Sequence, residues 1–378
     1  MQKFVLIPDS FKGTLSSTEI CEIMKEGILT HFPSAEVISI PVADGGEGSV
    51  DCFLTALGGE RVTLSVCNPY FEKIEGFYGI IDGGKTAVIE MAAAAGLPLV
   101  EDRKNPLLTT TYGVGELIID AAKRGVKKII LGLGGSSTND FGCGAAAACG
   151  IRFFDKNGKE FIPAGGTLCD IAKVDLSNKN PLLNGVEFVT MCDIDNPPYG
   201  ERGAAKVFAP QKGADEKAVE FLDSGVKHLC DLLEKGNGIK TGDLAGGGAA
   251  GAFGAGSVAF FNAKLKMGIE VVLDTVGFNS VLDGADVVFT GEGKLDGQSL
   301  GGKVVIGVSR AAKSKGVPVI AVVGGVEPEV SAVYEEGVTA VFSINRLPED
   351  FSVSRHKSHQ NLKLTFDNII RTLKFNSH

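Results

Sequence analysis

Strand and helix patterns alternate at both ends of the chain, and this alternation limits the fold more than any other feature. Phe4–Ile7 is typical of a buried strand, Ser16-x-x-Glu19 is a capping box that predicts a helix start, and Val37–Ile40 is the next predicted strand. The last third of the chain repeats the pattern: strands at Asp286–Phe289, Pro318–Val323 and Ala340–Ser343, and helices at Val304–Lys315, Glu329–Glu336 and Phe351–Leu373. Strands separated by helices of this length predict βαβ units and a parallel sheet.

The middle of the chain has a different pattern, with consecutive strands predicted at Arg61–Val66, Gly76–Ile80 and Thr86–Met91. A chain of 378 residues also exceeds one ordinary core. We therefore expect an α/β fold with a discontinuous domain, residues 1–60 and 280–378. This Rossmann-like domain would have three layers around a parallel sheet. A mixed α+β domain, residues 61–279, would be inserted into it, and the active site would lie in the interdomain cleft.

Charge and cysteine content restrict the possible partners. The net charge of −9 argues against nucleic acid or an anionic membrane as the main partner. The eight cysteines include no C-x-x-C pair, which is typical of reduced thiols in a cytosolic protein. No uncharged apolar run approaches the roughly 18 residues that a membrane span needs. We expect a soluble cytoplasmic protein, monomeric or homodimeric.

The segment IILGLGGSSTND, residues 129–140, predicts an anion site. An apolar strand pattern opens into Gly134 and Gly135, and a hydroxyl cluster of Ser136, Ser137 and Thr138 follows. Glycines allow backbone N–H groups to approach an anion, and a small-residue helix predicted at Ala145–Cys149 adds its positive end. We interpret this loop as a phosphate cradle with a carboxylate beside it.

Four further loops follow predicted strands and carry charged or amide side chains, which favours a ligand site at this edge of a sheet. They are Pro8–Gly13 with Asp9, Ser10 and Lys12; Ala43–Ser49 with Asp44; Met191–Pro197 with Asp193 and Asn196; and Thr290–Lys303 with Gly291, Glu292, Asp296 and Lys303. Each loop is also compatible with an ordinary Asx or glycine turn. The last comes close to a P-loop, but Val304 stands where the metal-binding hydroxyl would be.

A glycine pattern at Gly246-x-Gly248-x-x-Gly251 matches the dinucleotide fingerprint in letters only. The residues before it do not form a strand pattern, so we do not expect an NAD site or a dehydrogenase. The glycine-rich stretch 236–256 is expected to be mobile.

Taken together, five motifs resemble the glycerate kinase type 1 family, the bacterial glycerate 2-kinases, from Lys3 to about Ser343. They are PDSFKGTLS (8–16), PVADGGEGS (41–49), LGLGGSSTNDFGCG (131–144), CDIDNP (192–197) and TGEGKLDGQSLGGKV (290–304). The stretches IEMAAAAGL (89–97), TTTYGVGEL (109–117) and FAPQKGA (208–214) are also similar to that family. The resemblance implies a two-domain α/β fold, Mg²⁺, and transfer of the ATP γ-phosphoryl group to the 2-hydroxyl of D-glycerate, giving 2-phosphoglycerate.

Within that resemblance we assign expected roles. The nucleotide phosphates are assigned to Gly134, Gly135, Ser136, Ser137, Thr138, Gly291 and Lys303; the substrate to Asp9, Ser10, Lys12, Asp44, Asn139 and Asn196; the metal to Asp193, Glu292 and Asp296; and catalysis to Asp193, Lys12 and Asp296. Lys12, Lys303 and Arg202 compete for the glycerate carboxylate or the transferring phosphoryl group. Three alternatives stay open: 3-phosphoglycerate as product, another small hydroxy acid as substrate, and a non-catalytic sensor of glycerate or nucleotide.

Overall fold

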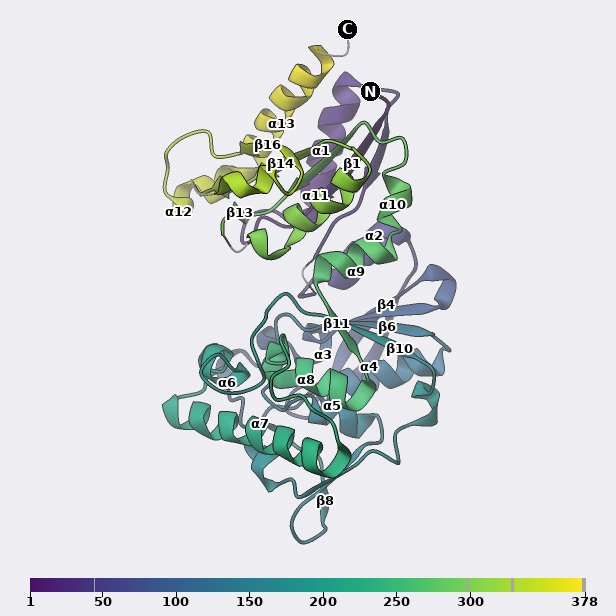
Figure 1. Ribbon diagram of the computed structural model, residues 1–378, viewed down its shortest axis with the longest axis vertical. Helices are drawn as coiled ribbons and strands as arrows, with labels where there is room; N and C mark the ends of the chain where they lie inside the picture. The colour runs from purple at the N-terminus through teal and green to yellow at the C-terminus, as the bar shows by residue number, and fades with distance from the viewer. Residues whose placement is uncertain (44, 298, 328–329, 376–378) are drawn as a thin grey trace. The chain divides into compact units, whose positions relative to one another are not determined.

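The computed structural model describes residues 1–43, 45–297, 299–327 and 330–375, and these form two compact units (Figure 1). The first unit contains Met1–Ala43, Thr55–Leu57 and the described part of Met267–His378. The second unit contains Gly58–Lys266 and the described part of Asp44–Leu54. The two predicted domains, a discontinuous one of residues 1–60 and 280–378 and an inserted one of residues 61–279, and a cleft between them, stay a prediction.

The first unit is built on a parallel five-stranded sheet in the order β16-β14-β12-β1-β2 (Figure 1). Its strands are β1 (Lys3–Pro8), β2 (Glu36–Ser39), β12 (Val287–Gly291), β14 (Val319–Val323) and β16 (Val338–Ser343). A short parallel pair, β13 (Lys294–Leu295) and β15 (Gly325–Val326), lies beyond it. The parallel sheet expected from both chain ends is confirmed.

Helices cover both faces of this sheet because successive strand residues point to opposite sides. Phe4 and Phe289 pack with residues of α1 (Ser17–His31) and α13 (Ser358–Phe375), whereas Ala321 packs with residues of α11 (Val304–Ser314). The remaining helices of this unit are α9 (Gly268–Thr275), α10 (Phe278–Val281), α12 (Phe351–Ser354), and the 3₁₀ helices η7 (Ser299–Gly301), η8 (Val330–Tyr334) and η9 (Arg355–Lys357). The three-layer arrangement is as predicted.

The capping box also forms as predicted. The Ser16 hydroxyl accepts a hydrogen bond from the backbone N–H of Glu19, whose carboxylate in turn accepts one from the backbone N–H of Ser16. By contrast, the helix expected at Glu329–Glu336 is only the short 3₁₀ helix η8 within the described residues.

The second unit holds a mixed six-stranded sheet in the order β11-β10-β6-β5-β4-β3. The strands are β3 (Glu60–Cys67), β4 (Lys73–Ile81), β5 (Thr86–Glu90), β6 (Lys128–Gly132), β10 (Glu187–Met191) and β11 (Lys264–Lys266). The pairs β3–β4 and β4–β5 are antiparallel, and the others are parallel. A separate three-stranded sheet contains β7 (Arg152–Phe154), β8 (Glu160–Phe161) and β9 (Lys173–Asp175).

The helices associated with this unit are mostly short. They are α2 (Ser49–Leu57), α3 (Ala92–Ala95), α4 (Tyr112–Lys123), α5 (Cys143–Ala148), α6 (Ala204–Phe208), α7 (Glu216–Asn237), α8 (Ala249–Phe261), and the 3₁₀ helices η1 (Asp82–Gly84), η2 (Leu97–Leu99), η3 (Glu101–Arg103), η4 (Gly165–Asp170), η5 (Pro181–Leu183) and η6 (Pro210–Lys212). In the described part of the chain, none of the helices has the length and apolar character needed to cross a membrane.

The stretch 236–256 has two parts: residues 236–245 are largely exposed, and residues 246–256 are buried. It contains the first half of α8, and Phe253 in this helix is fully buried. Its glycines allow close packing: a Cβ at Gly256 would lie 1.8 Å from the carbonyl oxygen of Phe141, and one at Gly254 would lie 2.3 Å from that of Gly246. Backbone contact therefore requires these two glycines, and the mobility expected of the stretch stays a prediction.

Candidate active site

The first unit has a topological switch point between β1 and β12. These strands are neighbours, but β2 extends the sheet on one side and β14 and β16 extend it on the other. In sheets of this kind ligands bind outside the carboxyl ends of the strands where the order reverses. Pro8 pairs with Gly291 there, and the backbone N–H of Asp9 donates to the Gly291 carbonyl at 2.8 Å. Two of the predicted loops therefore meet at this edge.

Glu292 is the most unusual residue at the switch point. It is only 6% exposed, and its Oε1 atom has no hydrogen-bond partner within the described residues. Burial raises the pKa of Glu292 to about 7; a hydrogen bond from Ser299 and the charge of Lys303 oppose the shift, while Asp9 and Asp296 add to it. The predicted residues Asp9, Asp296 and Lys303 thus lie within electrostatic reach of Glu292.

Glu292 and Asp296 fit a Mg²⁺ site that a substrate would complete. Mg²⁺ is commonly held by one or two carboxylates together with substrate phosphates and water, and the unpartnered Oε1 of Glu292 is a suitable oxygen ligand. The described residues contain no group of three or more His, Cys, Asp or Glu side chains placed to hold a metal ion. Asp193, the third expected ligand, belongs to the second unit.

The glycines and lysines of this edge have distinct places. A Cβ at Gly291 would lie 2.0 Å from the Val322 carbonyl oxygen, so this glycine permits β12 and β14 to approach closely. A Cβ at Gly293 would meet the backbone nitrogen of Lys12 at 3.2 Å. Lys303 is the N-cap residue of α11, where the backbone N–H groups of a helix favour anions.

The second unit places the glycine-rich loop between two other loops. β6 lies between β5 and β10, with Glu90, Gly132 and Met191 side by side. The carboxyl ends of all three strands therefore share one edge. A Cβ at Gly134 would lie 2.4 Å from the Cα of Gly46, so the Gly45–Gly46 turn packs directly on this loop. Asp44, which precedes that turn, lies outside the described residues.

The loop turns its carbonyl groups into the protein. The Gly135 carbonyl accepts from the Leu97 N–H at 2.8 Å and the Ser137 carbonyl accepts from the Thr109 hydroxyl at 3.1 Å. The Thr138 carbonyl accepts from Lys212 Nζ at 2.7 Å. No partner within the described residues accepts from the backbone N–H groups of Gly135, Ser136, Thr138 and Asn139. Paired carbonyls and unpaired N–H groups are the arrangement that an anion requires.

Two side chains of the loop are also buried without partners. The Thr138 hydroxyl and both amide atoms of Asn139 make no hydrogen bond within the described part of the chain. Buried polar groups are nearly always hydrogen-bonded, so unpaired ones point to a ligand or ordered water. The sequence predicts that Asn139 binds substrate. Its side chain is buried in this loop, and its role stays a prediction.

Asp140 anchors the loop. Its buried carboxylate accepts from the Thr111 N–H at 2.7 Å, the Thr111 hydroxyl at 2.8 Å and the Gly144 N–H at 3.2 Å. Burial raises its pKa and these hydrogen bonds oppose the rise. The Asp140 carboxylate therefore accepts its hydrogen bonds from Thr111 and Gly144 of the protein itself.

A pocket of about 400 Å³ opens beside the loop. Gly134, Gly135 and Ser136 line it, together with Asp193 from the loop after β10. Lys212, Ala249 and Ala250 also line it, and sequence reasoning assigned none of them. The structure thus brings three of the predicted phosphate residues, Gly134, Gly135 and Ser136, to one pocket with the predicted catalytic Asp193, whereas Ser137, Thr138, Gly291 and Lys303 do not line it.

The dismissed glycine pattern at 246–251 supports this pocket. Ala250, Gly251 and Ala252 have φ values of 54°, 66° and 67°, which form a left-handed turn at the start of α8. The Gly251 carbonyl accepts from the Phe141 N–H at 3.0 Å, and a Cβ at Gly251 would lie 2.1 Å from the Thr138 carbonyl oxygen. Gly251 therefore packs against the loop of residues 133–140, which we call the anion loop, and has no part in a dinucleotide motif. Residues with strained backbone conformations such as Ala250 and Ala252 cluster at functional sites.

Lys212 is the main residue that sequence reasoning missed. Its side chain is buried, and its Nζ atom donates to the Ser136 hydroxyl at 2.7 Å as well as to Thr138. Burial lowers the pKa of Lys212 to about 7, partly opposed by the charge of Asp140. The only available signal was the stretch FAPQKGA, since a lysine at the end of η6 looks like any surface lysine.

Asn196 and Arg202 are engaged with other groups. The Asn196 side chain donates to the Arg202 carbonyl at 2.7 Å, and Arg202 pairs with Asp195 at 2.6 Å. Both members of that pair are well exposed. Arg202 is therefore less suited than Lys212 to neutralise a buried anion.

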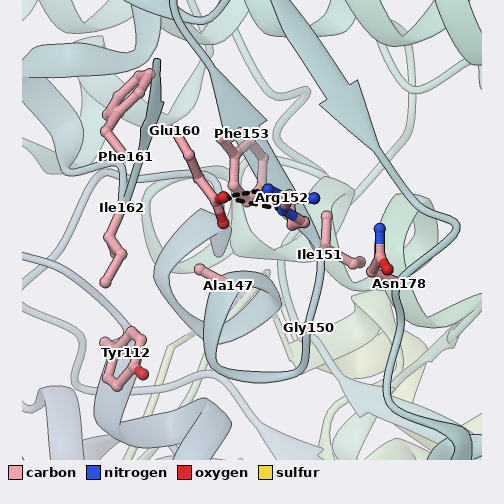
Figure 2. Close-up of a pocket in the computed structure, with 10 residues that line it drawn as sticks. All are labelled: Tyr112, Ala147, Gly150, Ile151, Arg152, Phe153, Glu160, Phe161, Ile162 and Asn178. Atoms are coloured by element: carbon pink, nitrogen blue, oxygen red, sulfur yellow. Dashed lines mark hydrogen bonds and ion pairs between the residues drawn. The ribbon is translucent and has the colours of Figure 1, made fainter. Parts of the chain in front are cut away.

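A larger pocket of about 720 Å³ contains none of the predicted residues. Figure 2 shows the Arg152–Glu160 ion pair at its centre, with Tyr112 and Ile162 at its wall. Because these two charged side chains pair with each other and are partly exposed, neither offers an unpaired charge to a ligand.

Comparison with known proteins agrees with the motifs. The model of the glycerate kinase family matches residues 4–374. A glycerate kinase from Bacillus cereus is 43% identical, with 99% of each chain covered. A glycerate 2-kinase from Escherichia coli K12 is 41% identical, with 90% of each chain covered. A crystal structure of a Salmonella typhimurium LT2 protein assigned as glycerate kinase 2 superimposes with a TM-score of 0.88 at 38% identity, covering 100% of this chain and 99% of that one. The chain therefore belongs to the glycerate kinase family.

Proposed function

We propose that the protein transfers the γ-phosphoryl group of ATP to the 2-hydroxyl of D-glycerate, giving 2-phosphoglycerate and ADP. The observation that carries this proposal is the loop after β6. The carbonyl groups of Gly135, Ser137 and Thr138 are hydrogen-bonded there, whereas the backbone N–H groups of Gly135, Ser136, Thr138 and Asn139 have no acceptor among the described residues. Family membership supports glycerate as the acceptor and a nucleotide as the donor. The name of the Escherichia coli relative supports the 2-hydroxyl.

The proposed step needs a base and charge neutralisation. The 2-hydroxyl oxygen bonds to the γ-phosphorus, the bond from that phosphorus to the β,γ-bridging oxygen breaks, and the hydroxyl proton passes to the Asp193 carboxylate. We assign the base to Asp193 because it lines the pocket beside the anion loop. Gly134, Gly135, Ser136, Ser137 and Thr138 are proposed to bind the nucleotide phosphates.

The switch-point residues of the first unit complete the proposal. Glu292 and Asp296 would hold Mg²⁺, which would neutralise phosphate charge when bound. Lys12 and Lys303 are proposed to bind the glycerate carboxylate or the transferring phosphoryl group, with Gly291 beside the nucleotide. Asp9 and Ser10 at the same edge, and Asp44, Asn139 and Asn196 on other loops, are proposed as substrate contacts.

The test is product identification. Purified protein is incubated with D-glycerate, ATP and Mg²⁺, and the product is identified by ³¹P and ¹H NMR. The proposal predicts 2-phosphoglycerate. Formation of 3-phosphoglycerate would overturn the regiochemistry but not the kinase, and ATP binding with no product from glycerate would point to another hydroxy acid or to a sensor.

A further inference from the structure

Lys212 is a buried cation without an anion. Lys212 is only 2% exposed. Among the residues that the structure describes, no carboxylate lies within ion-pair distance of its Nζ atom. Both of its hydrogen bonds go to uncharged oxygens, the Ser136 hydroxyl and the Thr138 carbonyl. An ammonium group removed from water is costly unless it is paired, so this position calls for a counter-charge.

The pocket offers a place for that counter-charge. An ammonium carries three N–H groups, and the two hydrogen bonds account for two of them. Lys212 lines the same pocket as Gly134, Gly135 and Ser136. The unpaired N–H groups of the loop favour the same kind of ligand as the ammonium does.

The charged groups near Lys212 do not already supply the anion. Asp140 acts on Lys212 through its charge, but its own carboxylate is held by Thr111, Gly142 and Gly144. Asp193 lines the pocket from the loop after β10. Within the described residues, the hydrogen bonds of Lys212 Nζ go to Ser136 and Thr138, and neither acceptor is a carboxylate.

We propose that Lys212 binds a phosphate oxygen of the nucleotide and at the same time fixes the Ser136 hydroxyl and the Thr138 carbonyl. The carbonyl is thereby kept away from the anion, and the loop presents its N–H groups. This inference rests on the proposed function, because that function supplies the nucleotide. It makes Lys212 a substrate-binding residue in addition to Lys12 and Lys303.

The test measures the dissociation constant of ATP by calorimetry for the full-length wild type, Lys212→Met, Lys212→Arg and a matched control, Lys206→Met. Lys206 lies six residues earlier in α6, pairs with Glu201 and Glu220, and does not line the pocket. We expect Lys212→Met to weaken ATP binding about 10-fold or more, as loss of a charge-assisted hydrogen bond does. Lys212→Arg should recover part of the affinity, and Lys206→Met should match the wild type.

A purely structural lysine would give another pattern. Equal ATP affinity in the wild type and Lys212→Met would overturn the proposal. The KM for D-glycerate then distinguishes two cases: if it is also unchanged, the lysine binds neither substrate, and if it is raised, the lysine acts on glycerate. A raised KM for D-glycerate would assign the Lys212 ammonium to the glycerate carboxylate. If Lys212→Met does not fold, Lys212→Gln takes its place, because glutamine keeps an N–H donor without the charge, and the same expectation applies.

The wild-type measurements separate this proposal from the proposed function. ATP binding by the wild type without any phosphorylated glycerate would overturn the kinase reaction but not the role of Lys212. Absence of ATP binding by the wild type would overturn both.

Discussion

The Thr111 hydroxyl lies between two buried partners: it donates to the Asp140 carboxylate at 2.8 Å, while its oxygen accepts from the Ala145 N–H at 2.9 Å. This one side chain therefore joins the start of α4, the end of the anion loop and the first turn of α5. The loop after β6 is thus held by a residue that lies outside it.

Thr111→Val should consequently destabilise the protein. The substitution keeps the shape of the side chain but leaves the Asp140 carboxylate short of a donor and the Ala145 N–H without an acceptor. We expect a loss of about 1–3 kcal/mol in the free energy of unfolding, measured by urea denaturation. Thr63→Val is the matched control, because Thr63 is exposed on β3 and should change stability by less than about 0.5 kcal/mol. Equal effects of both substitutions would contradict the anchoring role.

Gly251→Ala tests the contact between the left-handed turn and the anion loop. The new Cβ would lie 2.1 Å from the Thr138 carbonyl oxygen, in addition to the strain at a φ of 66°. We expect a lower melting temperature and weaker ATP binding, because Thr138 must move. Gly238→Ala is the control: its φ is 71°, but nothing lies within 4 Å of the new Cβ. That variant should lose only about 1–2 kcal/mol from backbone strain and keep its ATP affinity. If Gly251→Ala behaves like Gly238→Ala, the turn does not position the loop.

Much of this fold could be predicted from the sequence because its local signals agree with its packing. The capping box at Ser16 and the buried strand at Phe4–Ile7 both form where their patterns predict. The stretch 236–256 could not be predicted in the same way. Gly254 and Gly256 are required by carbonyl groups of Gly246 and Phe141, and such long-range contacts leave no periodic pattern.

The candidate site shows the same division. The glycines and hydroxyl residues in Gly134–Thr138 predict an anion-binding loop because an anion contacts consecutive residues, and such residues form a local sequence pattern. Lys212 reaches Ser136 across 76 positions of the chain, and no local pattern marks that partnership. Glu292 could be proposed as an acid near a strand end, but its burial and raised pKa follow from packing that only the structure gives.

Asp193→Asn should lower kcat strongly with little change in the dissociation constant of ATP. The amide keeps the size of the side chain but cannot accept the hydroxyl proton, and loss of a positioned base typically costs about 10²–10⁴-fold in rate. The kcat and the ATP affinity are measured separately, by a coupled assay and by calorimetry. Asp195→Asn is the control, because Asp195 is an exposed residue paired with Arg202. Turnover of Asp193→Asn close to that of the control would remove Asp193 from the chemistry.

Glu292→Gln should raise the Mg²⁺ concentration needed for half-maximal activity. The amide is a weaker ligand than a carboxylate, and the buried Oε1 is the proposed ligand atom. We expect an increase of about 10-fold, in the range that changes around a metal ligand produce. Glu327→Gln in the same unit is the control, since Glu327 pairs with Lys294 at the surface. An unchanged Mg²⁺ dependence would place the metal elsewhere.

The stability of the wild type should rise with pH relative to Lys212→Met. Burial lowers the pKa of Lys212 to about 7, whereas the unfolded chain keeps the ordinary lysine value of about 10.4. Between these values the unfolded state binds more protons than the folded state, so the free energy of unfolding increases as pH rises. The unfolding free energy of the wild type should therefore rise relative to that of Lys212→Met, by on the order of 3 kcal/mol from about pH 7 to about pH 9.5. Titrations of side chains remote from Lys212 are shared by both proteins and cancel in the difference. Urea denaturation of both proteins at the two pH values measures the shift. Lys206→Met, which removes a partly buried, ion-paired lysine, supplies the comparison. A difference that does not change with pH would mean that Lys212 keeps an ordinary pKa in the folded protein, and the ammonium would then have a counter-charge in the fold itself.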